Sequence, residues 1–441
     1  MNVGLIAMSG IRCCDSELLD MGLTLPGFVE RSATVASLPS LGLLTLAGMT
    51  CDKHSVDYFE IDDLPPEDDL ADHLDLVAIS SFTARIQDAY KLADQFRQRG
   101  TPVVLGGLHV TALPDEAAQH ADSIIIGEGE AVWNEILEDS MSGNLQPRYS
   151  SFDRPNFNLS AAPMPAFELL DISKYNRLTV QTSRGCPLKC EFCAASILLT
   201  PHYKQKPAEQ VLAEIDRIQE IWPRPFIEFA DDNSFINRRY WKDLLPELKK
   251  RRIKWFTETD LSIHEDEELL SLMRSSGCAQ VLIGLESPVE AGLQGIELKN
   301  DRKIQWWPDY IEAIKRIQSH GIRVNGCFVL GLDGHTPEIF DQVYDFVVES
   351  ELYDVQITYQ TPFPGTPLYD RLLKENRLLY PGNWDRCTLF DINFQPSDMT
   401  VEELRSGFYE LSSRLYNDEL TKWRRDIFKQ KYLRASKHRS N

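Results

Sequence analysis

The sequence predicts an α/β protein in which a doubly wound parallel sheet precedes a partial (β/α)6 barrel and a C-terminal helical region. Residues 1–145 alternate short apolar runs with amphipathic stretches of helical period. Residues 176–375 continue this alternation through six strand–helix repeats. Residues 146–175 have no clear period and hold several prolines, which is typical of a linker. Residues 376–441 carry a helix-capping box that starts at Thr400.

The predicted strands of the first domain are separated by predicted helices. Strands are expected at residues 3–8, 56–61, 76–80, 103–105 and 124–126, and helices at residues 37–49, 84–99, 113–119 and 130–139. This alternation favours a parallel sheet with helices on both faces. Ligands bind such sheets at the carboxyl ends of the strands, so the loops that follow the strands are candidate sites.

Three of these loops combine small and polar residues. They are Ser80–Thr83, Gly106–His109 and Gly127–Glu130, and they hold Gly106, Gly107, Gly127 and Gly129. Glycine lets a backbone approach a ligand closely, which favours a cofactor site. Ordinary strand-to-helix turns have the same composition and are the alternative.

Polar residues follow the strands predicted in the barrel. The strands begin near residues 178, 226, 253, 280, 322 and 355, and the residues at the ends of three of them include Asp231, Asp232, Asn233, Glu258 and Glu286. Chemistry in such barrels lies at the carboxyl ends of the strands. Carboxylates there suit a ligand that carries cations and hydroxyl groups. Any one of them, such as Asp232, could instead cap the next helix, but caps do not explain the whole set.

A cysteine motif follows the first barrel strand. Cys186, Cys190 and Cys193 have C-x3-C-x2-C spacing, with Phe192 directly before the last cysteine. Three thiolates on a short loop can converge on an iron–sulfur cluster, and a fourth would complete its coordination. Three thiolates therefore leave one iron open to a small ligand. Zinc is the alternative, although no histidine or fourth cysteine follows at the usual spacing.

This motif resembles that of the radical S-adenosylmethionine (SAM) superfamily. The resemblance implies a [4Fe–4S] cluster on the three cysteines, with SAM bound to the open iron through its amino and carboxylate groups. An electron, from a donor such as flavodoxin or ferredoxin, would split SAM to a 5′-deoxyadenosyl radical. The resemblance places Asp231–Asn233 at the SAM amino group and Glu258 and Glu286 near its ribose and methionine parts. It also counts Phe192 among the cofactor-binding residues.

The first domain resembles the cobalamin-binding domain found ahead of many radical SAM modules. By this resemblance the glycine-containing loops border the corrin, and the candidate residues are Ser80, Thr83, Gly106, Gly107, His109, Gly127, Glu128, Gly129 and Glu130. Many cobalamin proteins ligate cobalt with the histidine of a D-x-H-x-x-G motif. Asp52-Lys53-His54 lacks the glycine and lies at a strand entry, so we expect cobalamin without histidine on cobalt, with a vestigial site as the alternative. We expect His109 to make a hydrogen bond in a turn.

The composition disfavours several classes of partner. Asp and Glu outnumber Lys and Arg by 67 to 46, so the net charge is −21 and non-specific binding to nucleic acid or anionic membranes is disfavoured. No apolar run approaches the roughly 20 residues of a membrane-spanning helix, and the start of the chain lacks a basic signal-peptide region. Cysteines outside the motif show no paired framework, which indicates a reduced, cytoplasmic setting.

Together these features predict a cobalamin-dependent radical SAM enzyme that methylates an unactivated carbon of a small molecule. A radical rearrangement, cyclisation or carbon–sulfur bond formation by the same architecture is the main alternative. A cluster- or cobalamin-based sensor without turnover is a second one, but it leaves the carboxylates at the strand ends unexplained. We also expect Arg12, Cys13 and Cys14 to line the substrate side, with the arginine lowering a thiol pKa, unless the cysteines are merely packed.

Overall fold

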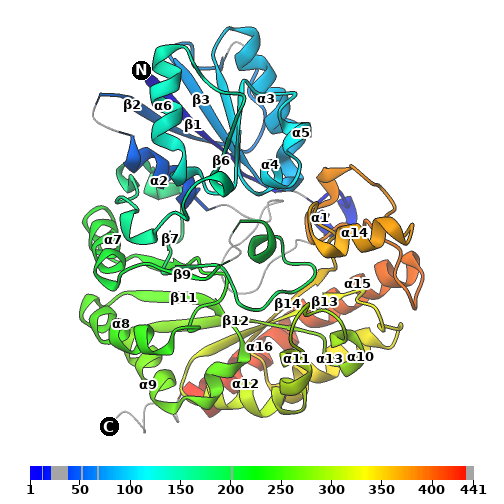
Figure 1. Cartoon of the computed structure of the whole chain (residues 1–441). Coiled ribbons are helices and arrows are strands. Elements are labelled where there is room, and N and C mark those ends of the chain that lie inside the picture. Colours follow the sequence, from blue (N-terminus) through cyan, green and yellow to red (C-terminus); the bar gives the residue numbers. More distant parts are fainter. Residues whose placement is uncertain (12, 21–37, 51–52, 67–68, 200–201, 434–441) are drawn as a thin grey trace.

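The computed structural model describes residues 1–11, 13–20, 38–50, 53–66, 69–199 and 202–433. Within these residues the strands form two six-stranded sheets and one two-stranded sheet. In Figure 1 the first large sheet, blue to cyan, lies above the second, green to yellow.

The first large sheet is parallel throughout and has the order β2-β1-β3-β4-β5-β6. Its strands are β1 (Asn2–Met8), β2 (Ser55–Ile61), β3 (Leu76–Ser81), β4 (Val103–Gly106), β5 (Ser123–Ile126) and β6 (Arg148–Ser150). The first five are the predicted strands. The strand order reverses direction at β1 and β3, and open α/β sheets bind ligands outside the carboxyl ends of their strands at such a point.

Helices cover both faces of this sheet, as predicted. They include α2 (Leu41–Met49), α3 (Ile86–Gln98), α4 (Leu108–Ala112), α5 (Pro114–Ala117) and α6 (Trp133–Ser142). On one face α3 buries Ile86, Tyr90 and Phe96, whereas α2 and α6 bury Leu43 and Trp133 in a separate apolar cluster. Two apolar layers around one sheet confirm the doubly wound arrangement.

The segment predicted to be a linker contributes the sixth strand. The Ile124 N–H donates to the Pro147 carbonyl at 3.0 Å, and β6 pairs with β5 at the edge of the sheet. Proline is tolerated beside an edge strand because its missing N–H is not needed there. The domain boundaries at residues 145, 175 and 375 stay predictions, and β6 favours extending the first domain to Ser150.

The second large sheet is also parallel and has the order β14-β13-β12-β11-β10-β7. Its strands are β7 (Leu178–Val180), β10 (Phe226–Phe229), β11 (Lys254–Thr259), β12 (Cys278–Glu286), β13 (Arg323–Leu330) and β14 (Asp354–Tyr359). Each begins within two residues of its predicted start. Because β7 and β14 are its two edges, this sheet is the predicted partial barrel.

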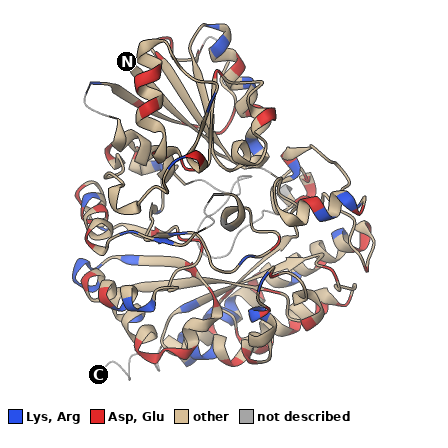
Figure 2. Cartoon of the chain, in the orientation of Figure 1, with Lys and Arg blue, Asp and Glu red and all other residues tan. Residues whose placement is uncertain are grey.

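Helices lie on the outer face of the barrel. They include α7 (Ala208–Ile221), α8 (Arg238–Arg251), α9 (Glu267–Ser276), α12 (Tyr310–Ser319) and α13 (Ile339–Ser350). Phe229 of β10 and Trp255 of β11 face outward onto Trp241 of α8, with ring centroids 5.1 and 6.0 Å from that indole. Side chains alternate along a strand, so Glu228 and Glu258 point to the inner face. Figure 2 shows most charged residues on the outer helices of both sheets.

The C-terminal region contains α14 (Pro367–Lys374), α15 (Val401–Tyr416) and α16 (Asp418–Ile427). The predicted capping box forms at α15: the Glu403 N–H donates to Thr400 Oγ1 at 3.1 Å, and the Glu403 carboxylate accepts from the Thr400 N–H at 2.7 Å. The Tyr416 hydroxyl accepts from the Ile357 N–H and donates to the Val355 carbonyl, both at 3.3 Å, and so covers the open edge of β14. In the part of the chain that the structure describes, none of the helices has the length and apolar character needed to cross a membrane.

Candidate cofactor site

The cysteine motif lies on a loop that is hydrogen-bonded to a second segment. The Glu191 N–H donates to the Ile296 carbonyl at 2.8 Å, and the Leu298 N–H donates to the Lys189 carbonyl at 2.7 Å. Cys190 lies between these two bonds. They fix the backbone of this cysteine from both sides.

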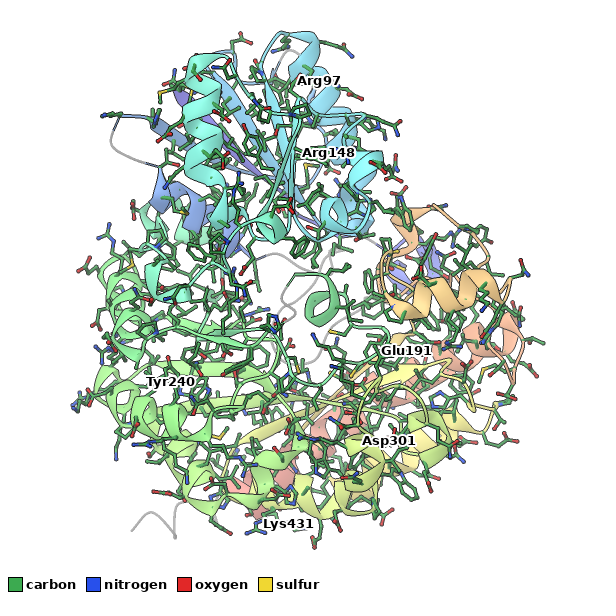
Figure 3. The ribbon with its side chains drawn as sticks, viewed as in Figure 1. Arg97, Arg148, Glu191, Tyr240, Asp301 and Lys431 are labelled. Carbon is green, nitrogen blue, oxygen red and sulfur yellow. The ribbon has the colours of Figure 1, made fainter. Side chains whose placement is uncertain are left out.

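Glu191 anchors the same loop to the C-terminal region. Its carboxylate accepts from Arg371 of α14 at 2.7 and 3.1 Å, and its carbonyl accepts from the Leu368 N–H at 3.1 Å. Arg371 also pairs with Asp333, just after β13, at 2.7 Å. Figure 3 labels Glu191 below the orange α14. The loop that carries Cys186, Cys190 and Cys193, which we call the cluster loop, is thereby held against the last part of the barrel.

The three thiols of the motif are free; Cys190 is buried, whereas Cys186 and Cys193 are partly exposed. Burial raises the pKa of Cys186 to about 11 and that of Cys190 to about 12, so metal binding must release protons from them. Phe192 packs against the apolar core of the barrel. Among the described residues, no group of three or more His, Cys, Asp or Glu side chains is arranged to hold a metal ion. The donors of the motif are all thiols, which fits an iron–sulfur cluster and not an oxygen-ligated cation.

Asp231, predicted to meet the SAM amino group, is engaged by the protein itself. It is 3% exposed and accepts from the Thr182 N–H at 2.7 Å, the Ser183 N–H at 2.9 Å and the Ser234 hydroxyl at 3.0 Å. The Thr182 hydroxyl is a fourth donor to it. A carboxylate with four protein donors has little capacity left for a ligand. Asp231 therefore positions the loop that leads to Cys186.

Asp232 and Asn233 lie beside the cluster loop. Asp232 accepts from the Gly185 N–H at 2.7 Å through one carboxylate oxygen. The Asn233 amide donates to Asp260 at 2.9 Å and lies 3.9 Å from the Cys186 sulfur. A carboxylate and an amide thus stand next to the first cysteine. Their contact with SAM stays a prediction.

Glu258 is the carboxylate most open to a ligand. Its side chain is accessible to solvent, yet it is surrounded by protein on the inner face of the barrel. This environment, together with the smaller effect of the neighbouring Glu228 and Asp232 charges, raises its pKa to about 7. No hydrogen bond or cation from the described residues offsets that effect. A cationic ligand would lower this pKa and be bound by the carboxylate.

Glu286 ends β12 and is paired with a lysine. Lys303 Nζ donates to Glu286 at 3.0 Å and to the Gly284 carbonyl at 2.6 Å, and both charged side chains are buried. Glu286 has a φ of 64°, a left-handed conformation that is costly for a residue other than glycine. Burial raises the pKa of Cys190, whereas the Lys303 charge acts to lower it. Glu286 thus holds a cation beside the cluster loop.

The glycine loops at the carboxyl edge of the first sheet are joined to one another. Thr111 Oγ1 accepts from the Gly127 N–H and donates to the Gly107 carbonyl, both at 2.9 Å. Gly107 and Gly127 have φ values of 109° and 86°, and a Cβ on Gly127 would lie 2.2 Å from a serine hydroxyl. Glycine is therefore required at these two positions. At Gly106 and Gly129 a Cβ would make only ordinary contacts.

The same edge leaves large apolar side chains open. Phe82, which lies between Ser80 and Thr83, is 51% exposed. Phe152, near Gly127, is 54% exposed. Exposed apolar groups beside glycine loops that a Cβ would fill fit a broad, largely apolar ring such as a corrin.

His109 makes the hydrogen bond predicted for it and lies in the core. It is 1% exposed, its Nε2 is 3.2 Å from a Glu116 oxygen, and its ring centroid is 5.3 Å from that of Trp384. Burial lowers its pKa. His54 lies before β2, at the amino end of the sheet, where its ring is 3.5 Å from the Met1 amino group. His109 follows Gly107 at the carboxyl edge, but its ring is buried in the core, whereas His54 lies at the opposite end of the sheet.

Glu128 and Glu130, predicted to border the corrin, pair with the barrel domain. Arg184 donates to Glu128 at 2.8 Å and to Glu130 at 2.9 Å, and Lys204 donates to Glu128 as well. We predicted no role for Arg184 or Lys204. The only signal in the sequence was the place of Arg184 directly ahead of the cysteine motif.

The loop after β1 packs against the C-terminal region. Cys13 is 3% exposed and its thiol donates to the Phe390 carbonyl at 3.4 Å, while the Cys14 N–H donates to Asp391 at 2.9 Å. Burial and the Asp391 charge raise the pKa of both thiols, to about 11 for Cys14. The predicted lowering of a thiol pKa is therefore wrong. Arg12 lies outside the described residues.

Known proteins match this chain in three regions. Residues 33–137 match the B12 binding domain, and residues 180–347 match the radical SAM superfamily. Residues 366–440 match a domain of unknown function, DUF4070.

Similar proteins include two named methyl-transferring enzymes. The chain is 28% identical over 393 residues to the bacteriochlorophyllide d C-12(1)-methyltransferase of Chlorobaculum tepidum, covering 88% of this chain and 84% of that protein. It is 31% identical over 358 residues to the hopanoid C-2 methylase of Rhodopseudomonas palustris, covering 79% and 67%.

Solved structures share the fold. The cobalamin-dependent S-adenosylmethionine radical enzyme OxsB superposes with a TM-score of 0.68 at 15% identity, over 99% of this chain and 71% of that one. The radical S-adenosylmethionine methyltransferase TsrM from Kitasatospora setae gives a TM-score of 0.65 at 16% identity, over 85% and 76%.

Proposed function

The chain belongs to the cobalamin-binding radical SAM enzymes, and from that premise we propose that it methylates an unactivated carbon of a small molecule. The cofactors of this family are a [4Fe–4S] cluster, SAM and cobalamin. The observation that carries the proposal is a contact between the two halves of the molecule. Glu128, at the cobalamin-type edge of the first sheet, pairs with Arg184, two residues before the first motif cysteine.

Different residues of this chain would bind the cluster, SAM and cobalamin. Cys186, Cys190 and Cys193 would hold the cluster, and Glu258 would face the cationic groups of SAM. Gly107 and Gly127 would let the first sheet approach the corrin closely. When bound, the cofactors supply reductive cleavage of SAM and a methyl group carried on cobalt.

The proposed chemistry needs an electron donor and a reducing environment. Each SAM cleavage needs one electron, so we propose a one-electron donor protein such as flavodoxin or ferredoxin. The eight cysteines that the structure describes are all free, which supports a reduced, cytoplasmic environment. The net charge of −21 disfavours nucleic acid as substrate and supports a small molecule.

Metal analysis and a SAM assay test the proposal together. Protein purified without oxygen and reconstituted with hydroxocobalamin should contain about four iron atoms and one cobalt per chain. With SAM and dithionite it should release 5′-deoxyadenosine and S-adenosylhomocysteine. Absence of 5′-deoxyadenosine from protein with a full cluster would contradict the radical chemistry.

The same assay separates the non-methylating alternative. A radical rearrangement, cyclisation or carbon–sulfur bond formation would give 5′-deoxyadenosine without S-adenosylhomocysteine. That outcome, with cobalt bound or not, would replace methyl transfer by one of these reactions.

A further inference from the structure

A group of four charged side chains joins the two large sheets. The strands β8 (Ser183–Arg184) and β9 (Lys204–Gln205) are antiparallel, and Arg184 pairs with Lys204 across them. The Arg184 guanidinium donates to Glu128 at 2.8 Å and to Glu130 at 2.9 Å, while Lys204 donates to the second oxygen of Glu128. Both acids lie in the segment between β5 and α6, at the carboxyl edge of the first sheet. We call these four side chains the clamp.

The clamp is largely shielded from water. The exposed fractions of the side chains are 18% for Arg184, 13% for Lys204, 8% for Glu128 and 7% for Glu130. Buried charges are screened little by salt, and removing one partner leaves the other uncompensated. Burial acts to raise the pKa of Glu130, but the charge and hydrogen bond of Arg184, with smaller help from Lys204, together outweigh it and the pKa is lowered. Loss of one partner of the clamp would therefore leave a buried charge unpaired where the two sheets meet.

On the barrel side the clamp continues into the cluster loop. Arg184 lies two residues before the first motif cysteine, and Gln181 Oε1 accepts from its guanidinium at 3.0 and 3.1 Å. The backbone on either side of Arg184 is also fixed. The Gly185 N–H donates to Asp232 at 2.7 Å, and the Ser183 N–H donates to Asp231 at 2.9 Å. Movement of Arg184 would thus displace the cluster loop.

On the other side the clamp continues into the glycine loops. The Glu128 N–H donates to Ser151 Oγ at 2.9 Å, and the Gly127 N–H donates to Thr111 Oγ1 at 2.9 Å. Each oxygen of Glu128 accepts from a cation of the barrel domain, so the charge of this carboxylate is already paired. The two acids are thus better suited to join the sheets than to bind the corrin.

We propose that Arg184 is a positioning residue which, through the clamp, fixes the distance between the cluster loop and the cobalamin-binding edge. The proposal rests on the proposed function, because this distance matters only if both cofactors serve one reaction. Contacts between domains of one chain commonly permit relative motion. A misplacement of about 1 Å between reacting groups can slow a reaction roughly 100-fold. The clamp removes this freedom.

The test compares Arg184→Gln with Arg154→Gln. Arg154, just after the first domain, pairs with Glu135 of α6 at 2.6 Å, with exposed fractions of 41% and 44%, so it is a matched loss of one ion-paired arginine. Both variants and the wild type are reconstituted with iron, sulfide and hydroxocobalamin. The readouts are iron and cobalt content, 5′-deoxyadenosine, S-adenosylhomocysteine, and the magnetic interaction between the reduced cluster and Co(II) by electron paramagnetic resonance.

We expect Arg184→Gln to keep both metals and to form 5′-deoxyadenosine within about threefold of the wild type. S-adenosylhomocysteine should fall at least about tenfold, and the magnetic interaction should weaken and broaden. Arg154→Gln should match the wild type in every readout. Glu130→Gln keeps the side-chain shape and removes one ion pair, so it should show a smaller change of the same kind and serves if Arg184→Gln fails to fold.

Two results would overturn the proposal. One is a clamp variant with the wild-type magnetic interaction and wild-type S-adenosylhomocysteine. The other is an equal loss of 5′-deoxyadenosine and S-adenosylhomocysteine, which would assign Arg184 to the cluster alone. Failure of the wild type to bind cobalt or to cleave SAM would instead refute the proposed function.

Discussion

The carboxyl edges of the two sheets hold their loops in different ways. The first sheet uses hydroxyl groups and glycine: Thr111 joins two loops, and Gly107 and Gly127 fit only without a Cβ. The barrel uses buried carboxylates, of which Asp231 accepts four hydrogen bonds and Glu286 holds Lys303. Acidic residues at a strand end are therefore weak evidence of a ligand site until their partners are known.

Glu258 is the instructive exception on the barrel side. It is a carboxylate near a strand end like its neighbours, but its surroundings raise its pKa to about 7 and no cation among the described residues lowers it. A cationic ligand that binds beside such a carboxylate stabilises its ionised form. Asp231 and Glu286 thus stabilise loops of the barrel, whereas Glu258 is available to bind SAM.

Replacing Cys186, Cys190 and Cys193 by alanine should abolish both the cluster and 5′-deoxyadenosine formation, because all three thiols of the motif are lost. Iron analysis and chromatography of the products check this. Cys14→Ala, which removes an exposed thiol elsewhere, is the control and should retain about four iron atoms. Iron at that level in the triple variant would exclude the motif as the cluster site.

Asp231→Asn should destabilise the fold by about 3 kcal/mol or more, because an amide cannot accept from all four buried donors. Urea unfolding measures the change. Asp243→Asn, on the exposed face of α8, should cost less than about 0.5 kcal/mol. A stable Asp231→Asn protein with weakened SAM binding would show that Asp231 binds SAM and is not mainly structural.

Glu258→Gln should leave the fold intact and weaken SAM binding about tenfold, since one charge-assisted contact is lost. Isothermal titration with SAM on the cluster-containing protein gives the affinity. If affinity is unchanged while Asp232→Asn reduces it, the free carboxylate is not the one that SAM uses.

The same variant should change the pH dependence of stability in the SAM-free protein. The pKa of Glu258 is raised from the usual 4.5 to about 7 on folding, so its protonated form favours the folded state and this stabilisation is lost as pH rises through 7. Glutamine does not ionise, so Glu258→Gln should melt on the order of 2 °C higher at pH 8. The gain should vanish as the pH falls to 4.5. A gain that is the same at both pH values would show that ionisation is not its cause.

His109→Ala should have the smallest effect on the cofactors. The ring is 1% exposed and bonded to Glu116, so its loss should cost about 1–3 kcal/mol of stability without touching the corrin. The visible spectrum of reconstituted cobalamin should stay base-off and match the wild type. A spectral shift would place a histidine on cobalt.

Most strands and the α15 helix cap could be predicted from the sequence, because local sequence patterns determine them. Every barrel strand and the first five strands of the N-terminal sheet follow from apolar periodicity, and the α15 capping box follows from Thr400 and Glu403. The strand β6 was not predicted, since three residues beside prolines carry no period. Edge pairing with β5 supplies the order that the segment itself lacks.

The partners of charged residues could not be predicted in the same way. Nothing in the spacing of Asp231 and Glu258 says that one accepts four hydrogen bonds and the other none from the described residues. The clamp is formed by Glu128 and Arg184, which are 56 residues apart and meet only after both sheets have formed. Long-range ion pairs depend on how the sheets pack, and local patterns do not encode that.

We conclude that the carboxyl edges of the two sheets serve one site, and a spectrum of the two metal centres can show whether they do. Wild-type protein reconstituted with the cluster and hydroxocobalamin is reduced until the cluster and Co(II) are both paramagnetic. We predict an electron paramagnetic resonance spectrum in which the spins of the cluster and Co(II) interact, and a weaker, broader interaction when the clamp is broken by Arg184→Gln. A wild-type spectrum equal to the sum of two independent centres would show that the two edges do not serve one site.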